Sequence, residues 1–290
     1  ASQAGLCCVD TLHRVTITGL EKNTTYFYRV LSQEVKELLP YRPVLGNIVS
    51  TDIWEKPLTF TTLDGRQETL SIVMINDIHG KNDLQKKLLE MAPPQNVDMV
   101  VFCGDMCNYI NKQSDIFTGF LDTSVGLFAS RKPFVYVRGN HETRGAYARN
   151  FFRYLAGPEG KFYYAFTYGP IRFIVLDSGE DKPDTDVEYS GLVDFDNYIL
   201  EQKEWLAREL ESPEFRAASF RVVLSHIPFG KGSWYGSERL RKQLLPLLES
   251  VRIDLMLSGH NHAFGFMDKG KVTAFPIIVN SNNSVLTMFG

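Results

Sequence analysis

The chain has 290 residues, of which 44% are hydrophobic, and its formal net charge is −3. This length fits one ordinary globular domain with a smaller companion, and the composition excludes disordered, collagen-like and disulfide-scaffold proteins. With 31 basic against 34 acidic side chains, the chain lacks the basic excess that favours binding to nucleic acid. No apolar run reaches the roughly 18 residues that a bilayer requires, so we expect no membrane span.

Residues 1–66 have the pattern of an all-β segment. His13–Leu20 and Tyr26–Leu31 alternate apolar and polar residues with a period of two, which predicts two strands. The spacing up to Tyr26 resembles the tyrosine corner of an immunoglobulin-like or fibronectin type III sandwich, and Pro57–Thr62 would be its closing strand. A complete sandwich takes about 100 residues, so we expect a partial module. The alternative is a β-rich extension of the main domain.

Residues 67–290 alternate short β-branched runs with stretches of helical periodicity, which predicts an α/β domain. The expected strands are Leu70–Asn76, Val97–Cys103, Phe134–Arg138, Ile171–Leu176, Phe220–Ser225, Ile253–Ser258 and Ala274–Asn280. The expected helices are Asn82–Met91, Gln113–Ala129, Thr143–Leu155, Asp196–Leu210 and Ser237–Ser250.

Polar clusters follow five of these strands directly. They are Asp77-Ile-His79, Gly104-Asp105, Gly139-Asn-His-Glu142, His226 and Gly259-His-Asn-His262. Ligands bind at the carboxyl ends of the strands in open α/β sheets, so these loops should converge on one crevice. Histidine is a common metal ligand, and aspartate and asparagine supply hard oxygens. The sequence therefore predicts a mixed nitrogen and oxygen site with more ligands than one ion needs.

This ordered set of motifs resembles the calcineurin-like metallophosphoesterases from about Glu68 to the end of the chain. The resemblance implies a four-layer α/β fold, in which helices flank a central sandwich of mixed sheets. It also implies a phosphoester hydrolase with two divalent metal ions, drawn from Mn, Fe and Zn. By the same resemblance, Asp77, His79 and His262 would hold one ion, Asn140, His226 and His260 the other, and Asp105 would bridge them.

His141 directly follows a predicted ligand and is therefore the candidate for protonating the leaving oxygen or stabilising the transition state. Its neighbour Glu142, or another carboxylate, could orient the imidazole and raise its pKa. We count both with Asp105 as candidate catalytic residues. The alternative role for His141 is a structural one, in which it only positions Asn140.

The β segment, the catalytic motifs and the Val223–His226 motif together are also similar to the purple acid phosphatases. Enzymes of that branch carry a tyrosine that ligates ferric iron, but the matching position here is Asn108, and Tyr109 comes one residue late. They also usually carry glycine at the position of His79. We expect His79 to replace the missing tyrosine as a ligand of the first metal, and the protein to be colourless or weakly coloured.

The substrate is less well defined by the sequence. Arg138 stands beside the third motif and is a candidate phosphate contact. Trp234 and Tyr235 follow His226 and could stack on an aromatic or nucleoside leaving group, although ordinary packing explains them equally well. The acidic segment 177–196 is expected to be a solvated surface loop, with a lid over the crevice as the alternative.

Together these features predict a two-metal hydrolase that cleaves a phosphomonoester or a small phosphodiester by direct attack of a metal-activated hydroxide. A nuclease or nucleotide pyrophosphatase is the alternative on the same site, and a catalytically inactive binding or adhesion protein is the alternative of another class. We expect a small phosphorylated substrate and no nucleic-acid partner, and the oligomeric state stays open. Analogy with exported sandwich-bearing enzymes favours a periplasmic or extracellular location over the cytoplasm.

Overall fold

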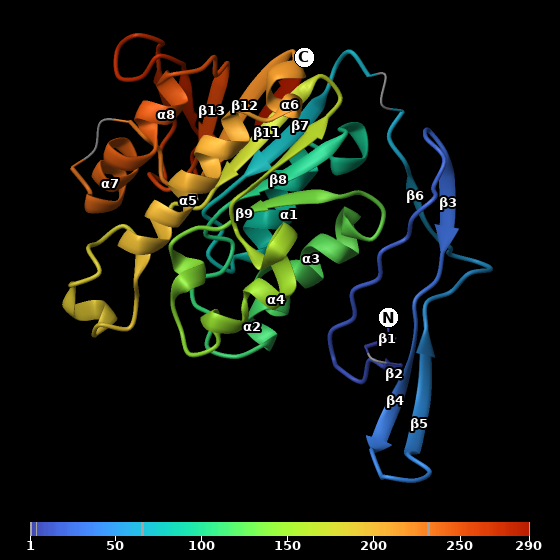
Figure 1. Cartoon of the computed structure of the whole chain (residues 1–290). Helices are drawn as coiled ribbons and strands as arrows, with labels where there is room; N and C mark the ends of the chain where they lie inside the picture. Colours follow the sequence, from blue (N-terminus) through green and yellow to red (C-terminus); the bar gives the residue numbers. More distant parts are fainter. Residues whose placement is uncertain (1, 4, 65–66, 231–232, 290) are drawn as a thin grey trace. The chain divides into compact units, whose positions relative to one another are not determined.

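The computed structural model describes residues 2–3, 5–64, 67–230 and 233–289. The chain divides into two compact units, Ala1–Gly65 and Arg66–Gly290. Figure 1 draws the first unit in blue and the second from cyan to red. In the described part of the chain, no helix is both long and apolar enough to cross a membrane.

The N-terminal unit consists of short antiparallel strand pairs. The pairs are β1 (Ser2–Gln3) with β2 (Leu6–Cys7), β3 (Thr25–Tyr28) with β6 (Leu58–Thr61), and β4 (Leu31–Glu37) with β5 (Val44–Ser50). None of the residues described between 5 and 64 is buried. The pairs are therefore held by backbone hydrogen bonds and local contacts, because the described residues of this unit form no core.

One strand predicted in this unit is wrong. His13–Leu20 forms no strand, because no other described segment pairs with it and an isolated extended segment leaves its backbone groups unpaired. Of the predicted strand Tyr26–Leu31, β3 takes only the first part, and it pairs with β6 inside the predicted closing strand. The hydroxyl of Tyr26 accepts a hydrogen bond from the backbone N–H of Glu21 at 2.7 Å. A tyrosine corner makes a contact of this kind, and the fibronectin-like assignment itself stays a prediction.

The second unit contains a four-stranded and a six-stranded sheet among its described residues. The first sheet has the order β16 (Leu286–Phe289), β7 (Ser71–Ile75), β8 (Met99–Cys103), β9 (Phe134–Val137). The second has the order β10 (Tyr164–Tyr168), β11 (Ile171–Leu176), β12 (Phe220–Ser225), β13 (Leu255–Ser258), β15 (Ile277–Val279), β14 (Gly265–Met267).

The central strands of each sheet are parallel, and the outer strands β16, β10 and β14 are antiparallel to their neighbours. All seven predicted strands of this unit are present, some shortened by one to four residues. The three antiparallel strands are additions that the sequence analysis missed. They lie at the edges of the sheets, where one neighbour and partial solvation leave a weaker hydrophobic pattern.

Helices cover one face of each sheet. Val73 and Phe102 of the first sheet pack with Leu88 of α1 (Asn82–Met91) in one buried cluster. Ile174 of the second sheet packs with Leu206 of α5 (Phe195–Leu210) in another cluster. Figure 1 shows α1 beside β8 and β9, and α5 beside β11.

The other faces of the two sheets pack against each other. The hydroxyl of Tyr164 in β10 donates to the backbone carbonyl of Tyr136 in β9 at 3.3 Å, and the thiol of Cys103 in β8 lies 3.7 Å from the carbonyl of Ser225 in β12. The order of layers is therefore helix, sheet, sheet, helix. This arrangement confirms the predicted four-layer α/β fold.

The remaining helical segments are α2 (Ser114–Ile116), η2 (Phe117–Leu121), α3 (Asp122–Ser124), η3 (Val125–Ala129), α4 (Phe152–Leu155), α6 (Pro213–Ala217), α7 (Tyr235–Gln243) and α8 (Leu245–Glu249), with single turns η1 (Pro94–Asn96), η4 (His141–Thr143), η5 (Ala148–Asn150), η6 (Pro158–Gly160) and η7 (Val187–Tyr189). Of the other predicted helices, Ser237–Ser250 is divided into α7 and α8, two differ more strongly from the prediction, and α6, η1, η6 and η7 were not predicted. The predicted helix Gln113–Ala129 alternates α turns with wider π turns.

The other of these two predicted helices, Thr143–Leu155, is wrong. The backbone carbonyl of Arg144 accepts from Ile110 N–H at 2.9 Å, and Tyr147 N–H donates to the carbonyl of Ile110 at 2.8 Å. Between these two bonds, Gly145 has a φ of +109°, and a Cβ there would lie 2.5 Å from the carbonyl oxygen of Ile110. These hydrogen bonds hold residues 144–147 against the loop that contains Ile110. Helical structure resumes only in η5 and α4.

Candidate metal centre

The polar loops that follow the parallel strands meet at one edge of the two sheets. The backbone N–H of His79 donates to the carbonyl of Asp105 at 2.9 Å. The backbone N–H of His260 donates to Oδ2 of Asp77 at 2.9 Å, and Nε2 of His226 lies 3.1 Å from Oδ2 of Asp105. Motifs from four strands of two sheets therefore contact one another, as the predicted convergence requires.

The backbone of these loops adopts an unusual conformation. A positive φ occurs at five predicted ligands: Asp77 (56°), His79 (52°), Asp105 (54°), His260 (70°) and His262 (56°). Non-glycine residues enter this left-handed region at an energetic cost, and such residues concentrate at functional sites. The conformation reverses the chain just after each strand and directs the side chains together.

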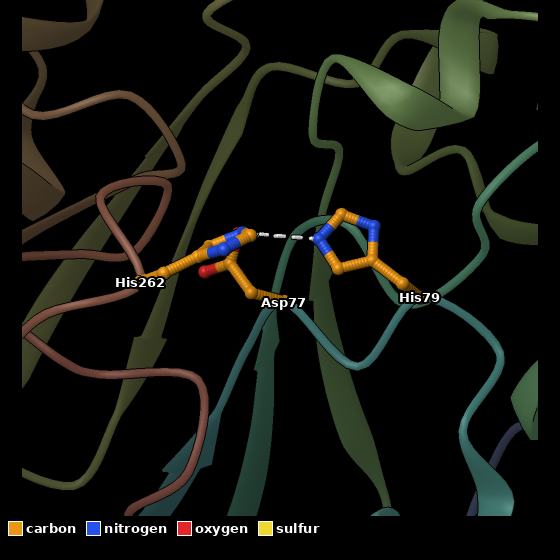
Figure 2. A group of neighbouring side chains, drawn as sticks. All are labelled: Asp77, His79 and His262. Atoms are coloured by element: carbon orange, nitrogen blue, oxygen red, sulfur yellow. Dashed lines mark hydrogen bonds and ion pairs between the residues drawn. The ribbon is translucent and has the colours of Figure 1, made fainter.

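One group of possible ligands consists of Asp77, His79 and His262 (Figure 2). The two histidines approach each other through their Nε2 atoms at 3.1 Å, and Nε2 of His262 lies 3.2 Å from Oδ1 of Asp77. At this distance only one of the two imidazole nitrogens can carry a proton, whereas both can bind a single cation through their lone pairs. The group therefore fits a metal ion bound by two imidazoles and one carboxylate.

A second group consists of Asp105, His226 and His260, and Asp105 also belongs to a third group with His79 and His141. Oδ1 of Asp105 accepts the backbone N–H of His141 at 2.9 Å, whereas Oδ2 faces His226. Asp105 is thus the carboxylate shared by the second and third groups, and His79 links the third group to the first. The position of Asp105 is the one expected of a bridging ligand.

Several potential ligand atoms are buried without a hydrogen-bond partner. They include Oδ1 of Asp77, Oδ1 of Asn140 and Nε2 of His260. Buried polar atoms are almost always paired in folded proteins, so unpaired ones at one location call for a missing partner. Asn140 does not belong to the three groups of acidic and histidine residues, but its side-chain oxygen is free to bind a cation.

The two carboxylates of the cluster, Asp77 and Asp105, favour a positive charge beside them. Burial lowers the pKa of His79 and of His260 to about 4, so both stay neutral and able to bind metal. Burial alone would also lower the pKa of His226, but Asp105 and Asp77 more than offset this effect and raise it to about 10. Asp77 and Asp105 therefore stabilise a proton on His226, and a cation could occupy the place of that proton.

The neighbours of these side chains orient them. The carbonyl of Cys103 lies 2.7 Å from Nδ1 of His226, which turns Nε2 toward Asp105. Cys103 and Cys107 are themselves buried, and burial raises the pKa of both thiols, which disfavours the thiolate form that binds metal. Asn76, which sequence reasoning missed, donates to Oδ2 of Asp77. The only available signal was a polar residue at the end of an apolar strand.

Glu142 does not orient the imidazole of His141, contrary to the prediction. Its buried carboxylate instead accepts three backbone N–H groups, from Asp105, Cys107 and Gly139, each at 2.9 Å. The carboxylate thus connects the backbone of the loop at Asp105 to the backbone of the loop at Asn140. The structure gives Glu142 a structural role and no direct contact with His141.

The imidazole of His141 lies at the margin of the cluster. Its Nδ1 is 3.0 Å from the carbonyl oxygen of Asn108, and its Nε2 is 3.9 Å from Oδ2 of Asp105. Its ring contacts the ring of His79 edge-on at 4.5 Å. His141 therefore lies within reach of a group bound between the predicted ligands. The neighbouring Tyr109 is 54% exposed, and its ring centroid lies 6.4 Å from that of His141.

Arg138 has a partner of its own. Its guanidinium pairs with the buried carboxylate of Asp177 at 2.6 Å and stacks on the ring of Phe162 at 4.4 Å. Because this ion pair engages its charge, the structure offers no support for Arg138 as a phosphate contact.

Trp234 and Tyr235 differ in their surroundings. The Trp234 ring is 55% exposed and meets the ring of His260 edge-on at 5.1 Å. The hydroxyl of Tyr235 donates instead to the carboxylate of Asp196 at 2.9 Å. Of the two predicted aromatic contacts, only Trp234 combines exposure with a contact to a predicted ligand.

The segment 177–196 is not a solvated loop at its start. Residues 177–181 are all buried, including Glu180 and Asp181. Glu180 forms a salt bridge with Arg144, with 2.8 Å between its Oε2 and the Nη2 atom. The prediction treated the polar character of the segment as a sign of solvation and overlooked that an arginine could pair with its buried carboxylates.

The chain resembles known phosphatases in sequence and fold. Residues 70–264 match the calcineurin-like phosphoesterase family. Purple acid phosphatase 22 of Arabidopsis thaliana is 24% identical over 273 residues, which cover 87% of this chain and 53% of that protein. A purple acid phosphatase of Glycine max is 24% identical over 295 residues, which cover 92% of this chain and 55% of that protein. The chain thus spans about half the length of these curated relatives.

Among solved structures, a dimetal phosphatase from Danio rerio has a similar fold, with a TM-score of 0.54 and 17% identity. The match covers 74% of this chain and 88% of that one. The family match extends over all five motifs from Asp77 to His262. The resemblance inferred from the motifs is therefore confirmed, and the chain belongs to the calcineurin-like phosphoesterase family.

Proposed function

We propose that this protein is a metal-dependent hydrolase of phosphomonoesters or small phosphodiesters. The observation that carries the proposal is that Asp105 belongs both to the group with His226 and His260 and to the group with His79 and His141, and that His79 also belongs to the group with Asp77 and His262. In this proposal the first cation is held by Asp77, His79 and His262, and the second by Asn140, His226 and His260. Asp105 bridges them.

Two cations bound in this way would polarise the phosphoryl group, lower the pKa of an attacking water and offset negative charge on the reacting oxygens. The protein contributes the arrangement of ligands. Both carboxylates have one oxygen fixed by hydrogen bonds, from Asn76 to Asp77 and from the backbone of His141 to Asp105. The remaining oxygens face the histidines, so little reorganisation is required when cations bind.

His141 is proposed to protonate the leaving oxygen or to stabilise the transition state. The proposal rests on its place beside Asp105 and His79, because proton transfer requires a group within reach of the reacting atoms. Asp105 contributes by bridging the ions. Glu142 contributes indirectly, through the backbone that it holds.

We propose that the metal ions are Mn, Fe or Zn, because imidazole and carboxylate ligands suit all three. The substrate is proposed to be a small phosphorylated compound with Trp234 beside its leaving group, because that exposed ring borders His260. The resemblance to purple acid phosphatases keeps an exported location as our proposal.

The test combines metal analysis with assays on p-nitrophenyl phosphate, bis-p-nitrophenyl phosphate and a nucleotide panel. We expect two metal ions per chain and hydrolysis of a mono- or diester. Asn140→Ala should lose one ion, whereas Asn197→Ala, whose exposed side chain bonds Asp194, should keep both. Full metal content and full rate in Asn140→Ala would refute the second-metal assignment, and a metal-loaded protein without hydrolysis would refute the function.

A further inference from the structure

Arg144 connects the buried start of the acidic segment to the imidazole of His141. Its Nε donates to Oε1 of Glu180 at 2.9 Å, and its Nη2 donates to Oε2 at 2.8 Å. Nη2 also lies 3.4 Å from Asp181. The remaining terminal nitrogen, Nη1, lies 3.3 Å from Nε2 of His141. The guanidinium therefore forms a bidentate ion pair with Glu180 through Nε and Nη2, and its Nη1 contacts the imidazole of His141.

The carboxylate that holds Arg144 is itself immobilised. The side chain of Glu180 is 1% exposed and also accepts from the hydroxyl of Thr143 at 2.5 Å and from that of Tyr189 at 3.0 Å. The backbone carbonyl of Glu180 accepts from Nη2 of Arg239 in α7 at 2.8 Å. A two-pronged arginine–carboxylate pair of this kind fixes geometry as well as charge.

The second nitrogen of His141 is also occupied. Nδ1 lies 3.0 Å from the backbone carbonyl oxygen of Asn108. A carbonyl oxygen can only accept and a guanidinium can only donate, so Nδ1 carries the proton and Nε2 accepts from Arg144. Both bonds select one tautomer and one ring orientation.

We propose that Arg144 is a positioning residue that fixes the imidazole of His141 and is itself anchored by Glu180. The inference deepens the proposed function, because it rests on a role for His141 in phosphoester hydrolysis. Arg144 is not assigned to phosphate binding, because Glu180 and Asp181 already surround its charge. Neither Arg144 nor Glu180 belongs to the groups of possible metal ligands among the described residues.

The first test needs no activity. In metal-free protein with ¹⁵N-labelled histidine, the ring signals of His141 are assigned by their loss in His141→Ala. We expect a protonated Nδ1 and an unprotonated Nε2 in the wild type, and a mixture of tautomers in Arg144→Ala and in Glu180→Gln. Arg144→Lys should retain part of the wild-type pattern. Arg149→Ala is the matched control, because that arginine is exposed and its Nη2 donates to the backbone carbonyl of Leu192.

The second test uses aryl phosphates with good and poor leaving groups in the metal-loaded protein. Arg144→Ala should lower kcat for the poor leaving group about tenfold to a hundredfold, with little change in KM and a smaller effect on the good one. In a His141→Ala background, Arg144→Ala should have no further effect.

Three results would overturn the inference: unchanged His141 signals in Arg144→Ala, additive effects of the two substitutions, or a rise in KM alone. Thermal melting of each variant separates these outcomes from misfolding, and Glu180→Gln supplies a variant that keeps the size of the side chain. If the wild type shows the expected tautomer but hydrolyses no ester, the positioning contact holds and the proposed function fails.

Discussion

The side-chain amide of Asn76 donates to Oδ2 of Asp77 at 2.5 Å and thereby leaves Oδ1 as the free oxygen of that carboxylate. Asn76 is in turn held by Asn280, whose amide donates to its side-chain oxygen at 2.7 Å. Both asparagines are buried. The orientation of one proposed ligand is thus fixed by residues outside the proposed ligand set.

Asn76→Ala should therefore weaken metal binding about tenfold to a hundredfold, the usual effect of removing a residue that orients a ligand. The loss follows because Asp77 can then rotate and its Oδ2 loses a donor. Isothermal titration with Mn²⁺ measures it, with Asn197→Ala as the control. Equal affinities in Asn76→Ala and the wild type would contradict the orienting role.

His79→Gly and His79→Ala should differ in stability without metal. Both remove the proposed ligand, but φ at this position is +52°, where glycine is unstrained and alanine is not. We expect the glycine variant to be about 1 kcal/mol more stable than the alanine variant. Urea unfolding of EDTA-treated protein compares them. Alanine as the more stable variant would show that the loop relaxes out of the left-handed region.

Glu142 should be important for stability because it accepts three backbone N–H groups. Glu142→Gln retains one acceptor oxygen and should destabilise the protein by about 1 to 3 kcal/mol, and Glu142→Ala should destabilise it further. Denaturant unfolding measures the order of the three proteins. Glu238→Gln, on the exposed side of α7, is the control and should be neutral.

The ion pair of Arg144 and Glu180 should make stability depend on pH. Burial alone would raise the pKa of Glu180, but hydrogen bonds from Arg144 and Thr143 more than offset it and place the pKa below its usual value. The ionised carboxylate therefore stabilises the fold above the pKa of the unfolded chain, and this contribution is lost as pH falls through the folded pKa. The gap in unfolding midpoint between wild type and Glu180→Gln should shrink in acid. A constant gap would contradict this expectation.

The iron-loaded protein should lack a strong visible band. The position of the purple-type tyrosine is Asn108, whose backbone carbonyl binds His141, and Tyr109 is exposed at the side of that ring with 6.4 Å between the ring centroids. Absorbance spectra of wild type and Tyr109→Phe should be the same. A strong band that disappears in Tyr109→Phe would show that Tyr109 binds the iron.

The core of the fold could be predicted from the sequence because its signals are local. Parallel strands buried on both faces, such as Val97–Cys103, give continuous apolar runs, and the polar residues after them could be read as a site. Edge strands lack that signal, so β10, β14 and β16 were missed. The helix expected over Thr143–Leu155 was wrong because Gly145 and the contacts to Ile110 override a favourable local pattern.

The orienting contacts could not be predicted, because they join residues far apart in the chain. Glu142 was assigned to His141 because the two are adjacent, whereas its carboxylate accepts from residues of the neighbouring loop. Glu180 looked like a solvated acid, and only the fold brings Arg144 to it. Residue type and spacing indicate which groups bind a metal, while long-range packing decides which groups orient them.

The left-handed backbone conformation also predicts how the sequences of relatives should differ. It occurs at Asp77, His79, Asp105, His260 and His262. Aspartate and histidine enter the left-handed region more readily than most side chains, but only glycine enters it without steric cost. In a homologue that has lost the metal centre, selection no longer opposes the strain, and glycine or asparagine should replace these residues at the same turns. The backbone conformation therefore marks the positions at which the sequences of active and inactive relatives should diverge first.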